Sequence, residues 1–224
     1  REPAGEVSVC LPTSFHDVVT LPLISEVRRA LPLVRLRVLE AMDAELREAI
    51  AAGVDIGVVM HDPERAIEGA APIPLGEDAL VLYGRPGAFP PGASIGFGQL
   101  RGLPLILPSG RNHLREKLAR LAGRHGVALD IVMEVDTAGL ITDLARRGEG
   151  FSVTPRMALK PPGEDGLEQW PIAGAGVAWA AYVRDTRRRS PAVAAVTERL
   201  TNLCRARLAA PPASIRAAAV ASPP

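Results

Sequence analysis

Three residues near the start of the chain have the side chains of a hydrolase triad. They are Ser14, His16 and Asp17. In a working triad the serine hydroxyl reaches one imidazole nitrogen while the carboxylate holds the other. Crowding all three residues into four positions disfavours that geometry. We therefore expect no nucleophilic catalysis here, and we predict that the chain is not an enzyme.

The sequence also lacks the usual patterns for a metal or a phosphate cofactor. The histidines His61, His113 and His125 stand apart and lack metal-ligand spacing. The segment Gly148-Glu149-Gly150 has neither the full GxGxxG pattern nor a following lysine, and a helix C-cap explains it better. We expect no metal ion and no cofactor.

Polar residues follow the predicted strands of this chain in a regular way. Open parallel sheets bind ligands beyond the carboxyl ends of their strands, where helix N-termini offer free N–H groups. Hydroxyl groups and backbone amides there suit the holding of a polar or anionic ligand without its transformation, although Ser, Thr and Asp at such positions are also ordinary helix caps. The candidates are Thr13 and Ser14, Met42 and Asp43, Pro108 and Ser109, Asp136 and Thr137, and Thr154, with Arg111, Arg115 and Arg156 as partners for a ligand carboxylate.

The elements that must position these residues alternate between strands and helices. Residues 6–10, 34–38 and 54–59 are predicted strands, and Leu21, Ile24, Val27 and Leu31 mark one face of a helix between the first two. Asp43 is the predicted cap of the next helix, and Gly53 lies just past its end. This order predicts a parallel sheet covered by helices, because parallel neighbours require crossover connections.

A second series of the same kind follows. Strands are predicted over 79–83, 104–107, 131–135 and 151–154, with one helix opened by Ser109 and another capped by Asp136 or Thr137. A last strand over 177–183 precedes a helix with Ser190 as cap and Pro191 at its first position. We predict an α/β fold of two Rossmann-like lobes, residues 5–76 plus 177–208 and residues 77–176, joined by a two-strand hinge over a ligand-binding cleft. Residues 209–224 form an Ala/Pro-rich tail that we expect to be disordered or loosely attached.

Composition narrows the class of protein further. The 26 basic and 25 acidic residues leave a net charge of +1, which gives no global attraction to nucleic acid or to an anionic membrane. Cys10 and Cys204 form no cluster and are predicted to be small core residues. Without a signal peptide or an apolar membrane span, a cytoplasmic location is expected. The chain opens on Arg1 rather than Met, which is typical of a fragment of a longer protein.

Taken in order, several segments resemble the effector-binding domain of LysR-type transcriptional regulators, a bacterial family with a type 2 periplasmic-binding-protein fold. The resemblance runs from about Gly5 to Leu203. The segments that carry it are Gly5-Glu6-Val7-Ser8-Val9, residues 31–40, Glu45-Leu46, residues 52–58, Glu134-Val135-Asp136-Thr137 and residues 144–155.

The resemblance implies a small-molecule site formed by Thr13, Ser14, Met42, Asp43 and Thr137, joined by Pro108, Ser109 and Phe151 of the other lobe. Met42 stands where many family members have a small hydroxyl residue, so a partly apolar ligand is expected. The resemblance also implies a homodimer or homotetramer, with DNA bound only through an N-terminal winged helix-turn-helix that this sequence does not contain. The alternatives are a solute-binding protein of a transporter and, as a third class, an enzyme of the same two-lobed shape.

Overall fold

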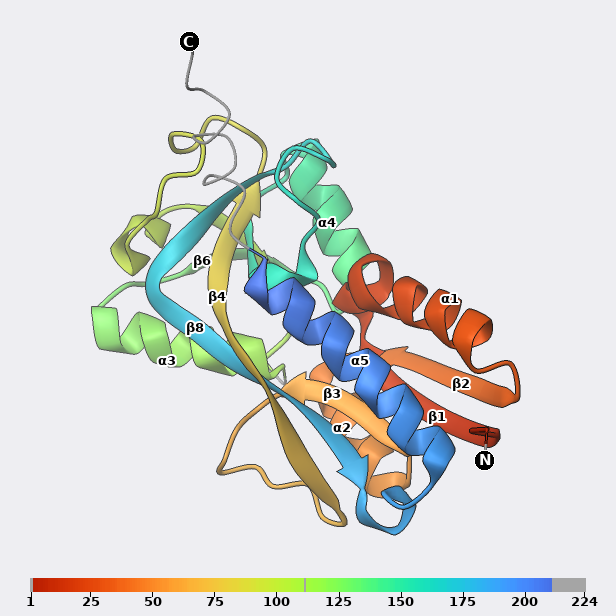
Figure 1. Ribbon diagram of the computed structural model, residues 1–224. Coiled ribbons are helices and arrows are strands. Elements are labelled where there is room, and N and C mark those ends of the chain that lie inside the picture. Colours follow the sequence, from red (N-terminus) through yellow and green to blue (C-terminus); the bar gives the residue numbers. More distant parts are fainter. Residues whose placement is uncertain (1, 111, 211–224) are drawn as a thin grey trace. The chain divides into compact units, whose positions relative to one another are not determined.

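A computed structural model describes residues 2–110 and 112–210 (Figure 1). The chain divides into two compact units, and each is described here by itself. Unit 1 comprises Arg1–Asp78 and Val177–Leu208, and the core of unit 2 is Ala79–Gly176. The chain passes from one unit to the other within two long strands, β4 (Ala70–Gly84) and β8 (Glu168–Arg184).

The sheet of unit 1 is built on three parallel strands. β1 (Gly5–Pro12) lies between β2 (Val34–Ala41) and β3 (Ile56–Met60), with Val9 opposite both Val38 and Ile56. The end of β8 then pairs with β3 in the antiparallel direction, with Val59 opposite Ala180. All three parallel strands therefore end at the same edge of the sheet.

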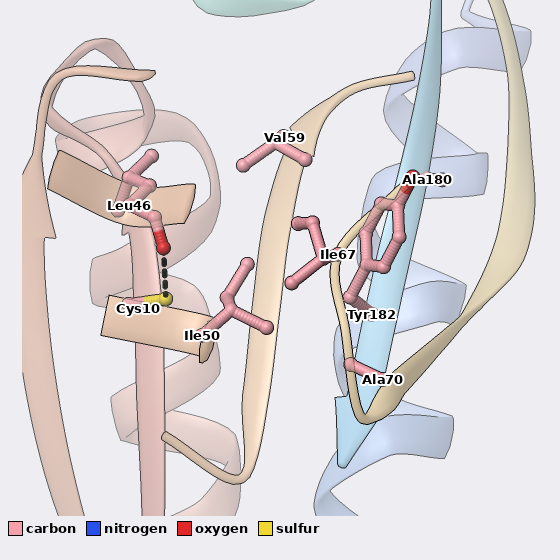
Figure 2. Packing of buried hydrophobic residues seen from close by; sticks show 8 residues of the cluster. All are labelled: Cys10, Leu46, Ile50, Val59, Ile67, Ala70, Ala180 and Tyr182. Atoms are coloured by element: carbon pink, nitrogen blue, oxygen red, sulfur yellow. Dashed lines mark hydrogen bonds between the residues drawn. The ribbon is translucent and has the colours of Figure 1, made fainter. Parts of the chain in front are cut away.

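One face of this sheet packs on α2 (Asp43–Ala52). Figure 2 shows Leu46 and Ile50 of this helix close to Cys10 of β1, in one apolar cluster with Ala180 and Tyr182 of β8. The Cys10 thiol lies 3.9 Å from the Leu46 carbonyl oxygen, and burial raises the pKa of this thiol to about 12. The helix ends at Gly53, whose φ of 116° is a conformation that favours glycine.

The opposite face of the unit 1 sheet is covered by α1 (Leu21–Ala30) and α5 (Pro191–Ala209) (Figure 1). The two helices are joined by an ion pair of Arg199 with Glu26 at 3.6 Å. Ser190 accepts a hydrogen bond from the Val193 amide at 3.4 Å, as the sequence predicts for the cap of α5. Cys204 is buried in this helix, so both cysteines are core residues, as predicted.

The buried carboxylate of Asp55 stabilises the unit 1 sheet where β3 begins, at the end opposite the carboxyl edge. Asp55 accepts hydrogen bonds from the amide of Ser8 at 2.8 Å, from the Ser8 hydroxyl at 2.9 Å and from Arg187 Nε at 2.7 Å. Burial by itself raises the pKa of Asp55, but the bonds from Ser8 and the bond and charge of Arg187 outweigh it and hold that pKa below its ordinary value. This carboxylate ties β1 and β3 to the turn that precedes α5.

Unit 2 has its own strands and helices. β5 (Pro104–Leu107) pairs in parallel with β6 (Asp130–Glu134), and β7 (Ser152–Pro155) pairs antiparallel with β4. Phe151 links the two pairs, because its amide donates to the Pro104 carbonyl and its carbonyl accepts from the Ile106 amide, both at 2.8 Å. The helices are α3 (His113–His125) and α4 (Ala138–Arg147).

Two predicted helix starts are wrong in detail. Asp43 is not the cap of α2 but its first residue, and Met42 holds the cap position without a side-chain hydrogen bond. Ser109 does not open α3. The helix begins four residues later, at His113, and its cap is Asn112, whose side chain accepts a hydrogen bond from the Leu114 amide at 2.9 Å. Thr137 does occupy the cap position of α4, although its side chain makes no capping bond. The predicted tail from residue 211 onward lies outside the described residues.

No helix in the described part of the chain is both long and apolar enough to cross a membrane.

Candidate functional site

The loops after β1 and β2 come together at the carboxyl edge of the unit 1 sheet. The first turn after β1 is a short 3₁₀ helix, Thr13–Phe15, and the Thr13 hydroxyl donates to the Met42 sulfur at 3.4 Å. Ser14 follows Thr13 and is half-buried. The structure thus brings together Thr13, Ser14 and Met42, three of the predicted site residues.

Asp43, also predicted for this site, is paired with an arginine of its own helix. Its buried carboxylate accepts a hydrogen bond from Arg47 Nε at 2.9 Å. The same guanidinium donates to the carbonyl oxygens of Met60 at 2.5 Å and Arg65 at 3.1 Å. Asp43 therefore holds the arginine that joins the start of α2 to the end of β3.

The segment after Thr13–Phe15 is a π-helical turn, His16–Thr20, that leads into α1. His16 Nδ1 lies 2.9 Å from a carboxylate oxygen of Glu40 at the end of β2. That hydrogen bond, and the charge of Glu40 with it, raise the pKa of His16 above its ordinary value. The carboxylate hydrogen-bonded to this imidazole is thus Glu40, from the end of β2.

Two aromatic residues at this edge were not predicted. Phe15 and Trp179 lie with their ring centroids 4.9 Å apart, and Trp179 stands opposite Met60 across the pairing of β3 and β8. Nothing in the residue pattern marks them, because a buried aromatic residue in a strand is usually only part of the core. Both rings are buried, and Phe15 directly follows Thr13 and Ser14 in the chain.

In unit 2 the loops after β5 and β6 also meet. The amide of Ser109 donates to Asp136 Oδ1 at 2.9 Å. Pro108, directly before it, is buried, and Thr137, directly after Asp136, is exposed at the start of α4. Ser109 makes this contact, and Thr137 directly follows the residue that accepts it. The two loops therefore meet, as expected for two parallel strands that end side by side.

The two remaining candidates of unit 2 are built into its packing. The Phe151 ring packs against Trp170 with centroids 6.1 Å apart and closely covers Gly84, where an added Cβ would lie 2.4 Å from the ring. Thr154 lies half-buried in β7, opposite Val81. Phe151 thus has a clear structural role.

Of the three arginines considered for a ligand carboxylate, Arg115 is the most informative. It is half-buried in the first turn of α3, and its Nε is buried without a hydrogen-bond partner in the described chain. Arg156 is half-buried and makes interactions of its own, and Arg111 lies outside the described residues. Within the described ranges no group of three or more His, Cys, Asp or Glu residues is arranged to hold a metal ion.

Comparison with known proteins assigns this architecture to a family. The sequence model of the LysR substrate binding domain matches residues 1–205. The chain belongs to this family. The α/β fold expected from the sequence, of the type 2 periplasmic-binding-protein kind, is confirmed by this match. The regulator family is favoured over the transporter alternative.

Three similar proteins illustrate the family. The nitrogen assimilation regulatory protein nac of Klebsiella aerogenes is 25% identical over 158 residues, which are 70% of this chain and 50% of that protein. The regulatory domain of CcmR from Synechocystis PCC6803, solved in complex with 2-PG, is 17% identical with a TM-score of 0.75, covering 90% of this chain and 98% of that one. Full-length CbnR, solved in a complex with its target DNA, is 20% identical with a TM-score of 0.67, covering 90% of this chain and 69% of that one. This LysR-type domain therefore spans about half the length of the curated relative it matches.

Proposed function

We propose that this chain is the ligand-sensing domain of a DNA-binding transcriptional regulator, and that it binds a small effector without transforming it. The observation that carries the proposal is the family match over residues 1–205. The chemistry of the strand ends supports it, since these offer hydroxyls, a thioether and backbone groups. The full-length protein acts in the cytoplasm, and a part outside this chain contacts the operator.

The effector that we propose is a small carboxylate or a related anion, and Arg115 supports this. A cation in the first turn of a helix is disfavoured by the helix dipole, so Arg115 does not serve the stability of α3. The N-terminal turn of a helix favours a negative charge nearby. An anion next to Arg115 would be favoured by both the guanidinium and this turn.

Replacing Arg115 by Gln should weaken carboxylate binding about tenfold to a hundredfold, because a charge-assisted hydrogen bond contributes roughly 1.5–3 kcal/mol. The measurement is a thermal-shift screen of the domain against small organic acids, amino acids and aromatic metabolites, since a ligand that binds only the folded state raises its melting temperature. Each acid that stabilises the wild type is then titrated into the variant.

Arg120→Gln is the matched control, because Arg120 is exposed on the same helix. Carboxylates that stabilise the wild type and Arg115→Gln to the same extent would remove Arg115 from the site. A broad library with no stabilising ligand at all would contradict the effector itself.

We further propose that the domain forms a homodimer, or a homotetramer built from such dimers, through apolar side chains that the fold leaves in water. β2 and β6 each stand at the end of their sheet, and exposed apolar residues gather on them and near them. Scattered exposed leucines are ordinary, but such residues beside a free sheet edge favour association. The set is Leu21, Leu33 and Leu39 in unit 1, and Val132 and Leu140 in unit 2.

Leu39→Asp and Leu140→Asp should each shift the protein towards monomer in sedimentation velocity at micromolar concentration, because a charge in an apolar interface loses its water. Ala119→Asp, on the exposed side of α3, serves as the control and should leave the oligomeric state unchanged. A wild type that sediments as a monomer, or variants that stay dimeric, would refute this interface.

A further inference from the structure

The two tryptophans of the chain differ in one respect. Trp170 is fully buried, and its indole N–H donates to the Pro90 carbonyl oxygen at 3.1 Å. Trp179 is also buried, only 4% exposed, but its indole Nε1 has no acceptor among the described residues. Buried donors are nearly always paired, so an unpaired one calls for a specific explanation.

Trp179 lies at the edge of unit 1 where the candidate site residues gather. It stands opposite Met60, the last residue of β3. His61, which follows Met60, donates its amide to the carbonyl of Ala178, the residue before Trp179, at 2.8 Å. The Trp179 ring contacts Phe15, which directly follows Thr13 and Ser14. The unpaired donor is therefore a neighbour of the loop proposed to bind the effector.

The segment that covers Trp179 has an irregular backbone. It runs from a 3₁₀ turn, Thr13–Phe15, into the π-helical turn His16–Thr20. The Thr20 hydroxyl is buried and likewise lacks a partner within the described residues. π-helical turns are rare and occur often at functional sites. A small shift of this segment would open Trp179 to a ligand.

The charges at this edge are already used within the protein. Arg47 holds Asp43 and two carbonyl oxygens, and His16 is bonded to Glu40. Among the described residues, unit 1 offers aromatic side chains and hydroxyl groups here, and the buried Trp179 N–H is a donor without an acceptor. This chemistry suits the uncharged part of a ligand.

We propose that the Trp179 indole N–H donates a hydrogen bond to the effector, and that the effector carries an acceptor oxygen on an aromatic or other apolar body. The inference rests on the proposed ligand-sensing function and names the ligand class and the anchoring residue of unit 1. Because Phe15 and Trp179 are buried, the segment that contains Phe15 must first move. The ring of the effector then packs against these two residues, and its oxygen accepts the hydrogen bond of the Trp179 N–H.

The test uses two probes of the same shape, cyclohexanecarboxylate and 4-oxocyclohexanecarboxylate, which differ by one acceptor oxygen. In a ¹⁵N-labelled domain the two indole N–H resonances are followed during titration, and Trp170→Phe assigns them. The ketone probe should move the Trp179 resonance and leave that of Trp170 in place. It should also bind about fivefold to tenfold more tightly than the other probe, and Trp179→Phe should remove this advantage.

Each outcome decides one point. If the ketone probe binds while the Trp179 resonance stays fixed, and Trp179→Phe keeps full affinity, the anchoring role is refuted although the sensor function stands. If neither probe binds but other molecules of the broad screen do, the ligand class is wrong. If nothing in the broad screen binds, the proposed function itself fails. The wild-type resonances give an answer even if a variant folds poorly.

Discussion

Asp55→Ala is expected to lower the free energy of unfolding by about 3 kcal/mol, because it leaves the Ser8 amide and Arg187 without their buried acceptor. The carboxylate accepts three hydrogen bonds that join β1, β3 and the turn before α5. Its partner Arg187 is 41% exposed, which keeps the expected loss below that of a fully buried ion pair. Urea unfolding followed by circular dichroism measures the loss.

The same residue predicts how stability depends on pH. The folded-state pKa of Asp55 is lowered, so its contribution is complete above the ordinary value of about 4 and is lost as the pH falls through the folded-state pKa. The Ala variant should therefore lose less stability than the wild type between neutral pH and acid. Asp185→Asn is the control, because Asp185 pairs with Arg188 at 3.3 Å with its side chain 58% exposed, and should change stability by less than about 0.5 kcal/mol. Equal losses in the two variants would contradict this account of Asp55.

Gly150→Ala should destabilise unit 2 by about 2–3 kcal/mol, because overpacking a tight site forces the backbone to move. An added Cβ would lie 2.7 Å from the Pro104 carbonyl oxygen and 3.0 Å from Ile106, and the backbone oxygen belongs to β5 and cannot turn aside. The residue that follows is Phe151, whose two backbone hydrogen bonds join β5 to β7. Thermal unfolding of the variant measures the effect.

Gly123→Ala should have the opposite effect on stability and serves as the comparison. Gly123 lies within α3, exposed and with open space where a Cβ would be, so alanine should stabilise the domain by up to about 1 kcal/mol through helix propensity. A Gly150→Ala protein as stable as the wild type would mean that the junction of β5 and β7 is looser than described.

The alternating pattern of the sequence is enough to predict most elements. The apolar positions of α1, the strand pattern of β2 and the run of apolar residues in β3 are local signals, and each lies in the predicted element. The long strands β4 and β8 were predicted only in part. β4 contains Pro72, Pro74 and Gly76, and β8 contains Gly174 and Gly176, residues that ordinarily argue against a strand interior.

Helix starts were less predictable, because several polar residues compete at each one. Asp43 resembles a cap, but Arg47 one turn later binds its carboxylate, and the cap position goes to Met42. Ser109 likewise resembles a cap, but its amide donates to Asp136, which follows β6, and the chain turns into α3 only after Asn112. In both cases a specific contact, between two side chains for Asp43 and between backbone and side chain for Ser109, outweighs a local preference.

At the candidate site, one contact follows from a sequence rule and one residue could not be found from the sequence. The rule that ligands bind at the carboxyl ends of parallel strands correctly placed Thr13 beside Met42, although they are 29 residues apart in sequence. Trp179 could not be found in this way. Its type and position are those of a core residue, and it is distinguished from Trp170 by the absence of an acceptor for its N–H among the described residues.

The central claim, that the domain binds an effector and does not transform it, is tested most directly by isothermal titration calorimetry of the domain with the strongest acid from the thermal-shift screen. The ligand is recovered from the cell and analysed by proton NMR. The account predicts saturable heat with a defined stoichiometry, and a ligand recovered unchanged after prolonged incubation. Steady heat that does not saturate, together with a new compound in the recovered sample, would show turnover and contradict the claim.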